Sequence, residues 1–208
     1  MVSLNKFKFE CVHCGNCCCD LNTIVNTTYS DILRIKNGLS TTIDEMLEIL
    51  GFYIHGDSLN SKNLSKMVIH PIQTENGLAF IGLRKNKSGR CVFYNNEKKR
   101  CAIYTIRPCF CRTFPFYFYL ENSIVNIGYT KKGLEYCQGI SDNYKVIDKD
   151  YWLELGKKAL DDLIENDKFI NHWNQEVNKQ KIKPTAKGFI SSIFKVGVSN
   201  KNHYKLNE

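Results

Sequence analysis

Ten cysteines are the residues of this 208-residue chain whose type and spacing are best suited to chemistry. Half of them lie in one short segment, at Cys11, Cys14, Cys17, Cys18 and Cys19. Two-residue gaps let a loop turn so that successive sulfurs face one ion, and backbone N–H groups of the loop stabilise the thiolate charge. Gly15 can adopt the positive φ that such loops often require. The run therefore predicts metal binding by thiolates.

This cysteine run cannot complete a cluster by itself in either of two familiar ways. The run of two-cluster ferredoxins would need a further cysteine at the position of Leu21. A Cys-x3-Cys-x2-Cys run of the radical-SAM type, placed on Cys14 and Cys18, fails at the same position. More distant ligands are therefore expected, and the candidates are Cys91, Cys101, Cys111 and Cys137.

Together these candidates can form two four-sulfur sites, one polynuclear site, or one site with spare thiols. Four thiolates suit Zn²⁺, with Zn–S distances of about 2.3 Å, and they equally suit an iron–sulfur cluster such as [4Fe–4S]. The adjacent Cys17 and Cys18 point in different directions on an extended backbone, so they can serve different metal positions. Cys19 and Cys109 are expected to be buried thiols outside the ligand set.

Four other residues near the cysteines are candidates for contacts around the metal or with a substrate. His13 lies inside the first run and can be a metal ligand, a loop residue or a donor to a ligand. Arg107 and Arg112 flank Cys111, where they can lower thiolate pKa values, bind an anionic substrate or pair with acidic side chains. Tyr104 is expected to pack around the site. No catalytic residue is assigned.

Composition is that of an ordinary globular chain, with 43% hydrophobic and 24% charged residues. The formal net charge of +8 counts every thiol as neutral, so thiolates at a metal site would offset much of it. Nucleic acid is therefore not the expected partner, which we take to be a protein or a small-molecule substrate. No apolar run approaches the roughly 18 residues of a membrane span. With no apolar signal core before Cys11, we expect a cytoplasmic protein, where thiols stay reduced and bind metal.

Local patterns predict a small, irregular α+β domain around the cysteine-rich site. Two short helices are expected from Thr28 or Ser30 to Lys36 and from Thr42 to Leu50, followed by a loop over 53–66. Two hairpins are expected, one about Glu75-Asn76-Gly77 joining strands over 68–72 and 78–83, the other joining strands over 116–120 and 124–129. Residues 91–94 look strand-like, and Pro108 should end a helical turn at Arg107.

The pattern changes near residue 149, where apolar residues recur at helical spacing up to residue 179. This predicts one long helix, or two helices with a break near Asn166-Asp167. The tail from Pro184 predicts a short amphipathic helix that docks on the rest of the protein. We therefore expect a cysteine-cluster domain over residues 1–145 and a helical extension over residues 146–208 that packs on it.

Two multi-residue motifs resemble those of the YkgJ-type cysteine-cluster family, whose CxxCxxCC domain is described as zinc- or iron-chelating. The first motif runs from Phe9 to Cys18. The second is Cys101-Ala102-Ile103-Tyr104, then Arg107-Pro108, then Cys111-Arg112-Thr113-Phe114-Pro115, and Cys91 and Cys137-Gln138-Gly139 fit the remaining positions. The resemblance spans about residues 7–140. It implies a ligand set of Cys11, Cys14, Cys17, Cys18, Cys91, Cys101, Cys111 and Cys137.

Three functional readings are open. The first is an iron–sulfur protein with oxidoreductase chemistry. The second is a structural zinc module that mediates a protein interaction. The third, by analogy with the related flagellin lysine-N-methylases, is a protein-lysine N-methyltransferase-like enzyme. The absence of a glycine-rich nucleotide loop after a predicted strand counts against a doubly wound SAM enzyme.

Overall fold

The computed structural model describes residues 7–54 and 68–204, with side chains up to residue 197. The expected loop over 53–66 lies mostly outside this range. The chain forms two compact units, each built from two separate stretches of sequence. We call residues 1–23 and 85–162 the cysteine unit, because all ten cysteines belong to it, and residues 24–84 and 163–208 the helix–sheet unit. The division at residue 145 stays a prediction.

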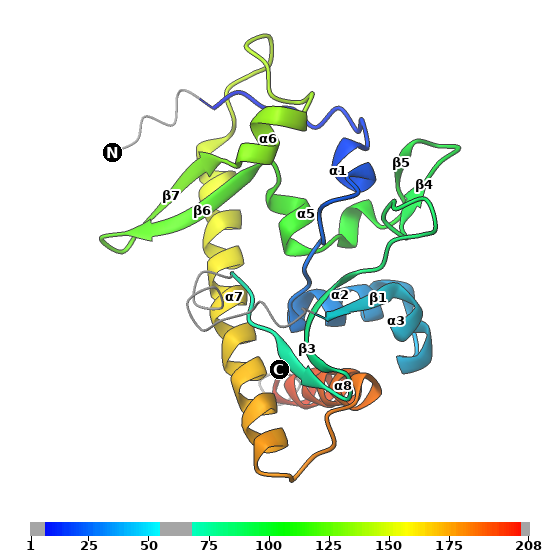
Figure 1. The fold of residues 1–208 in the computed structure, drawn as a ribbon. Coiled ribbons are helices and arrows are strands. Elements are labelled where there is room, and N and C mark those ends of the chain that lie inside the picture. Colours follow the sequence, from blue (N-terminus) through cyan, green and yellow to red (C-terminus); the bar gives the residue numbers. More distant parts are fainter. Residues whose placement is uncertain (1–6, 55–67, 205–208) are drawn as a thin grey trace. The chain divides into compact units, whose positions relative to one another are not determined.

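The cysteine unit is made of short elements (Figure 1). In chain order they are α1 (Asn16–Cys19), β4 (Tyr94–Asn95), β5 (Arg100–Cys101), the 3₁₀ turn η2 (Tyr104–Ile106), α5 (Cys109–Thr113), β6 (Phe116–Glu121), β7 (Ile124–Tyr129), α6 (Lys131–Tyr136) and the first half of α7 (Lys149–Asn178). The helical turn before Pro108 is confirmed by η2. Of the strand expected over 91–94, only Tyr94 lies in a strand, β4. Cys91 instead forms an isolated bridge to Lys85.

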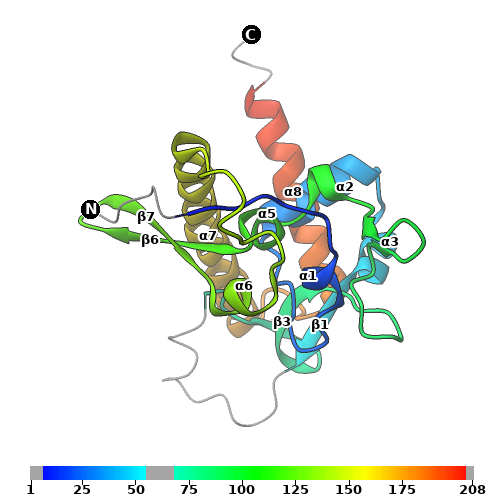
Figure 2. The same cartoon turned by 90° about the horizontal axis from the view of Figure 1, so that it is seen from above.

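The β6–β7 hairpin (Figure 2) is confirmed, and it contributes Phe116 and Ile127 to the hydrophobic core of the cysteine unit. Its turn residues Asn122 and Ser123 both have positive φ, as a tight two-residue turn between antiparallel strands requires. The buried core residues are Phe7, Phe116, Ile127 and Ile147, with Phe9, Phe118, Tyr129 and Trp152 packed against them. The segment just before Cys11 is therefore anchored in this aromatic core, which fixes where the first cysteine run begins.

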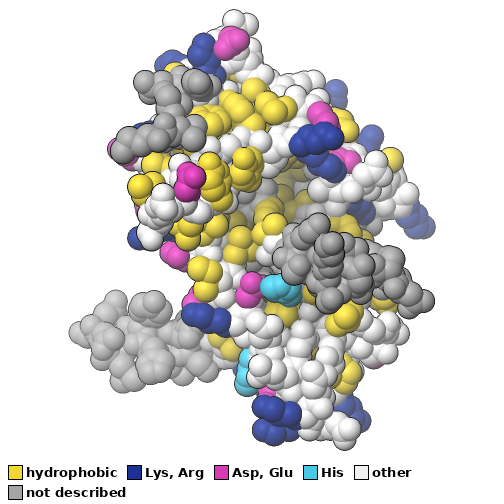
Figure 3. Space-filling model, turned by 60° about the vertical axis from the view of Figure 1, so that its left-hand side comes forward, with side chains coloured by type: hydrophobic (Ala, Val, Ile, Leu, Met, Phe, Trp, Pro, Cys, Tyr) yellow, Lys and Arg dark blue, Asp and Glu magenta, His cyan; other side chains and the backbone are white. Residues whose placement is uncertain are grey.

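Part of the hairpin surface remains hydrophobic. Figure 3 shows hydrophobic side chains gathered on the face that it presents. Tyr117, Leu120 and Ile124 of the hairpin are exposed. Tyr117 and Ile124 lie on the strand face opposite to the buried Phe116 and Ile127, because successive side chains point to opposite faces, whereas Leu120 shares the face of Phe116 near the end of the strand.

The helix–sheet unit contains an antiparallel sheet in the order β1-β3-β2, formed by β1 (Leu50–Ile54), β2 (Ile72–Thr74) and β3 (Gly77–Leu83). The predicted hairpin about Glu75-Asn76-Gly77 joins β2 and β3, and Gly77 has a φ of 108°. The first strand begins at Ile72, four residues later than the apolar pattern predicted. Val68 is exposed, so its apolar character does not reflect a buried strand.

Both short helices of this unit begin with a capping box, which explains where they start. Thr28 caps α2 (Tyr29–Leu39) by accepting a hydrogen bond from the Asp31 N–H, while the Asp31 carboxylate accepts one from the Thr28 N–H. Thr42 and Glu45 form the same arrangement at α3 (Ile43–Ile49). Of the two predicted starts of α2, Thr28 is confirmed as the cap and Ser30 is wrong.

The C-terminal part is helical, as predicted. The chain forms one unbroken α7 rather than two helices, because Asn166 does not end the helix but accepts a hydrogen bond from the Tyr29 N–H at 2.9 Å. The tail forms α8 (Ala186–Tyr204), whose Phe189, Ile190 and Ile193 are buried and which contacts α2 and α3 (Figure 2). Its docking is confirmed, and with it the α+β class with short hairpins and a C-terminal helical part. Among the described residues, no helix combines the length and apolar character of a membrane span.

Candidate metal centre

All ten cysteines lie in the described part of the chain, within the cysteine unit, and none is in a disulfide bond. They come from separate segments: the first run around α1, the turn at Cys91, strand β5, helix α5 and the residue that follows α6. Since these segments are far apart in the sequence, their meeting depends on specific long-range backbone contacts.

One such contact brings Cys137 to the start of the first run. The Glu10 N–H donates a hydrogen bond of 3.0 Å to the Gly139 carbonyl, and Phe9 bridges to Ile140. The approach is so close that a Cβ atom on Gly139 would lie 2.2 Å from the Glu10 carbonyl oxygen. As a result the Cys137 thiol interacts electrostatically with Cys11, Cys14 and Cys17.

A second contact brings Cys91 to the other end of the run. The Cys91 N–H donates a hydrogen bond of 2.9 Å to the Cys18 carbonyl. The run itself turns at Gly15, whose carbonyl accepts hydrogen bonds from the N–H groups of Cys18 (2.9 Å) and Cys19 (3.1 Å). Gly15 has a φ of 76°, as expected from the sequence, but the short helix α1 was not predicted. A glycine followed by four polar or small residues gives no periodic signal for a helix of one turn.

Cys101 and Cys111 complete this second group. Cys101 pairs with Tyr94 across β4 and β5, and Tyr94 in turn donates its N–H to the Cys91 carbonyl at 2.9 Å. Cys111 lies in α5, which starts directly after Pro108, a residue suited to a helix start because it lacks an N–H. Charges on Cys111 interact with those on Cys17, Cys91 and Cys101. Cys109 of the same helix is buried, as predicted, whereas Cys19, also predicted to be buried, is only partly buried because it lies at the end of the short surface helix α1.

The adjacent Cys17 and Cys18 have opposite acid–base properties. Their sulfurs lie 4.0 Å apart. The hydrogen bond from Cys18 stabilises the Cys17 thiolate and, together with the positive charge of Arg107, lowers the pKa of Cys17 to about 7. The same hydrogen bond and burial raise the pKa of Cys18. Cys17 is exposed, so it is the thiol best prepared to meet an incoming metal ion as a thiolate.

Burial raises the pKa of the other thiols for which a shift is resolved, which are Cys91, Cys101, Cys111 and Cys137. These sulfurs are neutral thiols at neutral pH unless a cation binds. Among the described residues, no three Cys, His, Asp or Glu side chains converge closely enough to hold a metal ion. The thiols therefore interact electrostatically, but their sulfur atoms do not surround a common position. Metal binding would require them to lose protons and turn towards each other.

The remaining candidate residues lie around the same thiols. Arg107 interacts electrostatically with Cys17, Cys101 and Cys111, and its guanidinium carbon lies 3.9 Å from the centre of the Tyr104 ring. The His13 ring lies 4.6 Å from the same ring, centre to centre. The Arg112 Nε atom is buried and has no hydrogen-bond partner in the described residues. The chemistry of this donor set, which is thiol-rich with a cation beside it, fits zinc or an iron–sulfur cluster.

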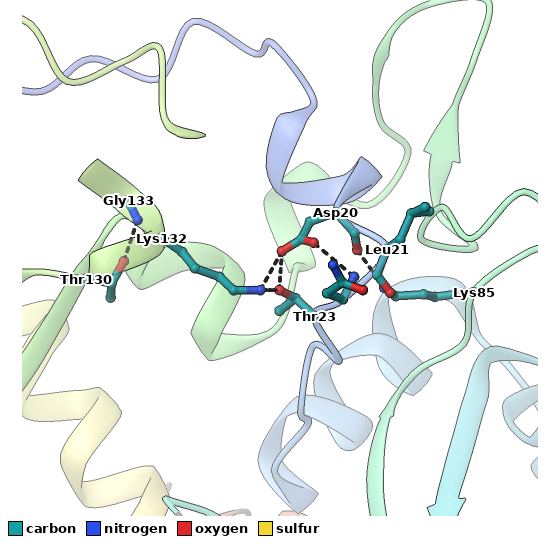
Figure 4. A network of polar contacts seen from close by, with 8 residues as sticks. Asp20, Leu21, Thr23, Lys85, Thr130, Lys132 and Gly133 are labelled. Atoms are coloured by element: carbon teal, nitrogen blue, oxygen red, sulfur yellow. Dashed lines mark hydrogen bonds and ion pairs between the residues drawn. The ribbon is translucent and has the colours of Figure 1, made fainter. Parts of the chain in front are cut away.

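A polar network that the sequence did not reveal fixes the exit of the first run (Figure 4). Lys132 of α6 contacts the Asp20 carboxylate at 2.6 Å and also contacts Thr23, which donates to Asp20. Lys85 donates hydrogen bonds to the carbonyls of Asp20 (2.6 Å) and Leu21 (2.7 Å). The network therefore ties together three segments next to the cysteines: the exit of the first run, the residues preceding Cys91 and the helix preceding Cys137. Hydrogen bonds from Lys132 and Thr23 hold the pKa of Asp20 well below its usual range.

We expect Asp20→Asn to lower the free energy of unfolding by about 1–2 kcal/mol, because the charged hydrogen bonds of a partly buried pair are lost. The matched control is Asp142→Asn, since Asp142 forms an ion pair with Lys8 in the same unit but is fully exposed. The control should unfold like the parent protein. Urea denaturation of the three proteins checks this, and equal losses in both variants would contradict the structural role of the network.

Comparison with known proteins points to the same region of the chain. The family model CxxCxxCC, described as "Putative zinc- or iron-chelating domain", matches residues 10–138. The chain is also similar to an uncharacterised protein of Methanocaldococcus jannaschii, with 28% identity over 139 residues. The match covers 67% of this chain and 62% of that relative's length. No solved structure matches the chain.

Proposed function

Because the chain belongs to the CxxCxxCC family, we propose that its cysteine unit binds an iron–sulfur centre through eight thiolates and acts in electron transfer. The observation that carries the proposal is that thiols from five separate segments interact electrostatically with one another, and that three of these thiols, Cys17, Cys101 and Cys111, also interact with Arg107. Eight thiolate ligands suit iron–sulfur clusters. The chain also lacks the fixed spacing of cysteines and histidines that is typical of zinc fingers. When bound, such a centre supplies one-electron oxidation and reduction.

The backbone contacts support a division of the ligands into two groups of four. The hydrogen bond between Glu10 and Gly139 favours one group of Cys11, Cys14, Cys17 and Cys137. The hydrogen bond between Cys91 and Cys18, with strand β5 and helix α5, favours the other group of Cys18, Cys91, Cys101 and Cys111. Cys17 and Cys18 then belong to different groups. They do not lie on the extended backbone that the sequence predicted, because both belong to helix α1 and their sulfurs lie 4.0 Å apart.

Residues of the chain would tune this centre in two ways. Arg107 supplies a positive charge that offsets part of the negative charge of several thiolates. Burial of Cys91 and the partial burial of its neighbours limit the access of water. The access of water and the net charge together set the reduction potential of a thiolate-bound centre.

Metal analysis of protein purified without oxygen tests the identity of the centre. We expect iron and acid-labile sulfide, with visible absorption that bleaches on reduction. A colourless protein with a full complement of zinc would instead support the structural zinc module, in which the metal holds the segments together and a partner protein binds the surface. The methyltransferase-like reading and the cytoplasmic location both stay predictions.

Single cysteine variants test the proposed division. We expect Cys137→Ser and Cys111→Ser each to lose about half of the bound metal, because each removes one ligand from a different group of four. Cys109→Ala is the matched control, since Cys109 lies two residues from Cys111 in the same helix but is placed outside the ligand set. Full metal content in both serine variants, or an equal loss in the control, would contradict the assignment.

A further inference from the structure

A basic cavity lies beside the second group of thiols. It has a volume of about 820 Å³, and the residues that line it include His13, Lys98, Lys99, Arg100, Cys101 and Tyr104. This volume falls within the range of about 300–1,000 Å³ that is typical of small-molecule sites. No Asp or Glu of the described residues lines it. The cavity therefore combines three adjacent permanent cations with one candidate metal ligand.

The three cations have no ion-pair partner within the part of the chain that the structure describes. Other surface lysines do have one: Lys158 pairs with Glu154 at 2.6 Å and Lys187 pairs with Asp44 at 2.7 Å. Three neighbouring positive charges repel each other, and Glu97, the carboxylate nearest to them in the sequence, forms no ion pair with them within the described residues. A bound anion would relieve this repulsion, and it would gain charge-assisted hydrogen bonds from the lysines and the arginine.

The turn that carries these cations is held in one conformation. Asn95 pairs with Arg100 across β4 and β5, and its side chain accepts a hydrogen bond of 2.8 Å from the Lys98 N–H. Arg90 fixes the neighbouring Asn96 through its side chain. Lys99 has a φ of 48°, a left-handed conformation that glycine adopts without strain and lysine does not. A lysine side chain is thus present at a position where the backbone would favour glycine.

Two ring side chains also line the cavity. The Tyr104 ring contacts both the Arg107 guanidinium and the His13 ring, and His13 itself has a φ of 53°. His13 is exposed. The cations and the two rings therefore line one cavity next to Cys101.

We propose that this cavity binds a phosphorylated small molecule, with its phosphate groups at Lys98, Lys99 and Arg100. Phosphate carries more negative charge and more acceptor oxygens than a carboxylate, and the arginine fork matches its geometry. The cations gather at one cavity rather than along an extended stripe, which favours a small ligand over a nucleic acid. The proposal rests on the proposed function only in that Cys101 places the ligand beside the metal; the phosphate contacts do not involve the metal.

Titration of the full-length protein with pyrophosphate, followed by calorimetry at low and moderate salt, tests the proposal. The variant K98Q/K99Q/R100Q should bind at least about tenfold more weakly, the effect of losing about 1.4 kcal/mol or more of binding free energy. The control K145Q/K149Q/K157Q removes the same charge from exposed lysines of the same unit and should bind like the parent. Absence of binding, or equal weakening in both variants, would overturn the proposal.

Two further variants separate this cavity from folding and from the metal centre. Lys99→Gly relieves the left-handed backbone, so it should weaken pyrophosphate binding without lowering the melting temperature. Cys137→Ser, whose residue does not line the cavity, should keep pyrophosphate binding even where metal is lost. Loss of binding in this cysteine variant would overturn the independence of the two sites, and tighter binding of a short RNA than of pyrophosphate would overturn the assignment to a small molecule.

Discussion

Asp31→Ala is expected to lower the free energy of unfolding by about 3 kcal/mol, at the lower end of the range for breaking a buried ion pair. The Asp31 side chain is fully buried at the start of α2. One carboxylate oxygen accepts the Thr28 N–H at 3.1 Å, and the other lies 2.6 Å from Arg34. Alanine removes both interactions and leaves a buried N–H group and a largely buried guanidinium without that carboxylate. Equilibrium urea denaturation followed by circular dichroism measures the loss.

The chain contains a matched control for this prediction. Glu45 occupies the same position of the capping box of α3, where its carboxylate accepts the Thr42 N–H at 2.8 Å in an exposed setting. Glu45→Ala removes the same type of hydrogen bond, but water can replace it, so the loss should be much smaller than for Asp31→Ala. Equal losses would show that the cap itself, and not its burial beside Arg34, accounts for the effect.

Gly139→Ala is expected to destabilise the cysteine unit by about 2–3 kcal/mol, as overpacking of a tight site does. The new Cβ atom would lie 2.2 Å from the Glu10 carbonyl oxygen and 2.9 Å from the Phe9 ring. Backbone atoms cannot rotate away as a side chain can, so the two segments must separate. Because this contact brings Cys137 to Cys11 and Cys14, we also expect less bound metal, which elemental analysis of the purified variant measures.

Gly197→Ala is the matched comparison, because the added Cβ atom meets a side chain there and a backbone carbonyl at Gly139. Its added Cβ atom would approach only the end of the Leu33 side chain, which can move, and alanine favours the α-helix in which Gly197 lies. We expect unchanged or higher stability and unchanged metal content. Unchanged metal content in Gly139→Ala would show that the contact with Glu10 does not position Cys137.

Elements with short-range causes followed from the sequence. The turn at Asn76-Gly77 predicted the β2–β3 hairpin, and Thr42 predicted the start of α3, because a turn or a cap depends on residues within a few positions. The local pattern left two alternatives open where a distant contact decides. Residues 149–179 predicted one long helix or two with a break near Asn166, and the Asn166 side chain binds the Tyr29 backbone, 137 positions earlier in the chain, within one continuous helix.

For the candidate metal centre, too, one part could be predicted from the sequence and another part could not. Spacing alone singled out the cysteines of the first run and the need for remote ligands, since metal binding demands thiols at particular intervals. Nothing in the spacing indicated that Lys132 would bind Asp20 across 112 positions, or that Lys98 and Lys99 would line a cavity with His13. Charged side chains at loop positions carry no periodic signal, so only the folded chain shows which of them face a common site.

The sequence by itself determined the family, the α+β class and the residue types available to a metal, because motifs and local propensities depend on residues that are close together in the sequence. Only the tertiary structure decided which thiols are neighbours. Cys137 meets Cys11 through Glu10 and Gly139, and Cys91 meets Cys18 through one backbone hydrogen bond. Such contacts form when the aromatic core and the polar network close the loops between them, and that long-range packing cannot be read from the intervals between cysteines.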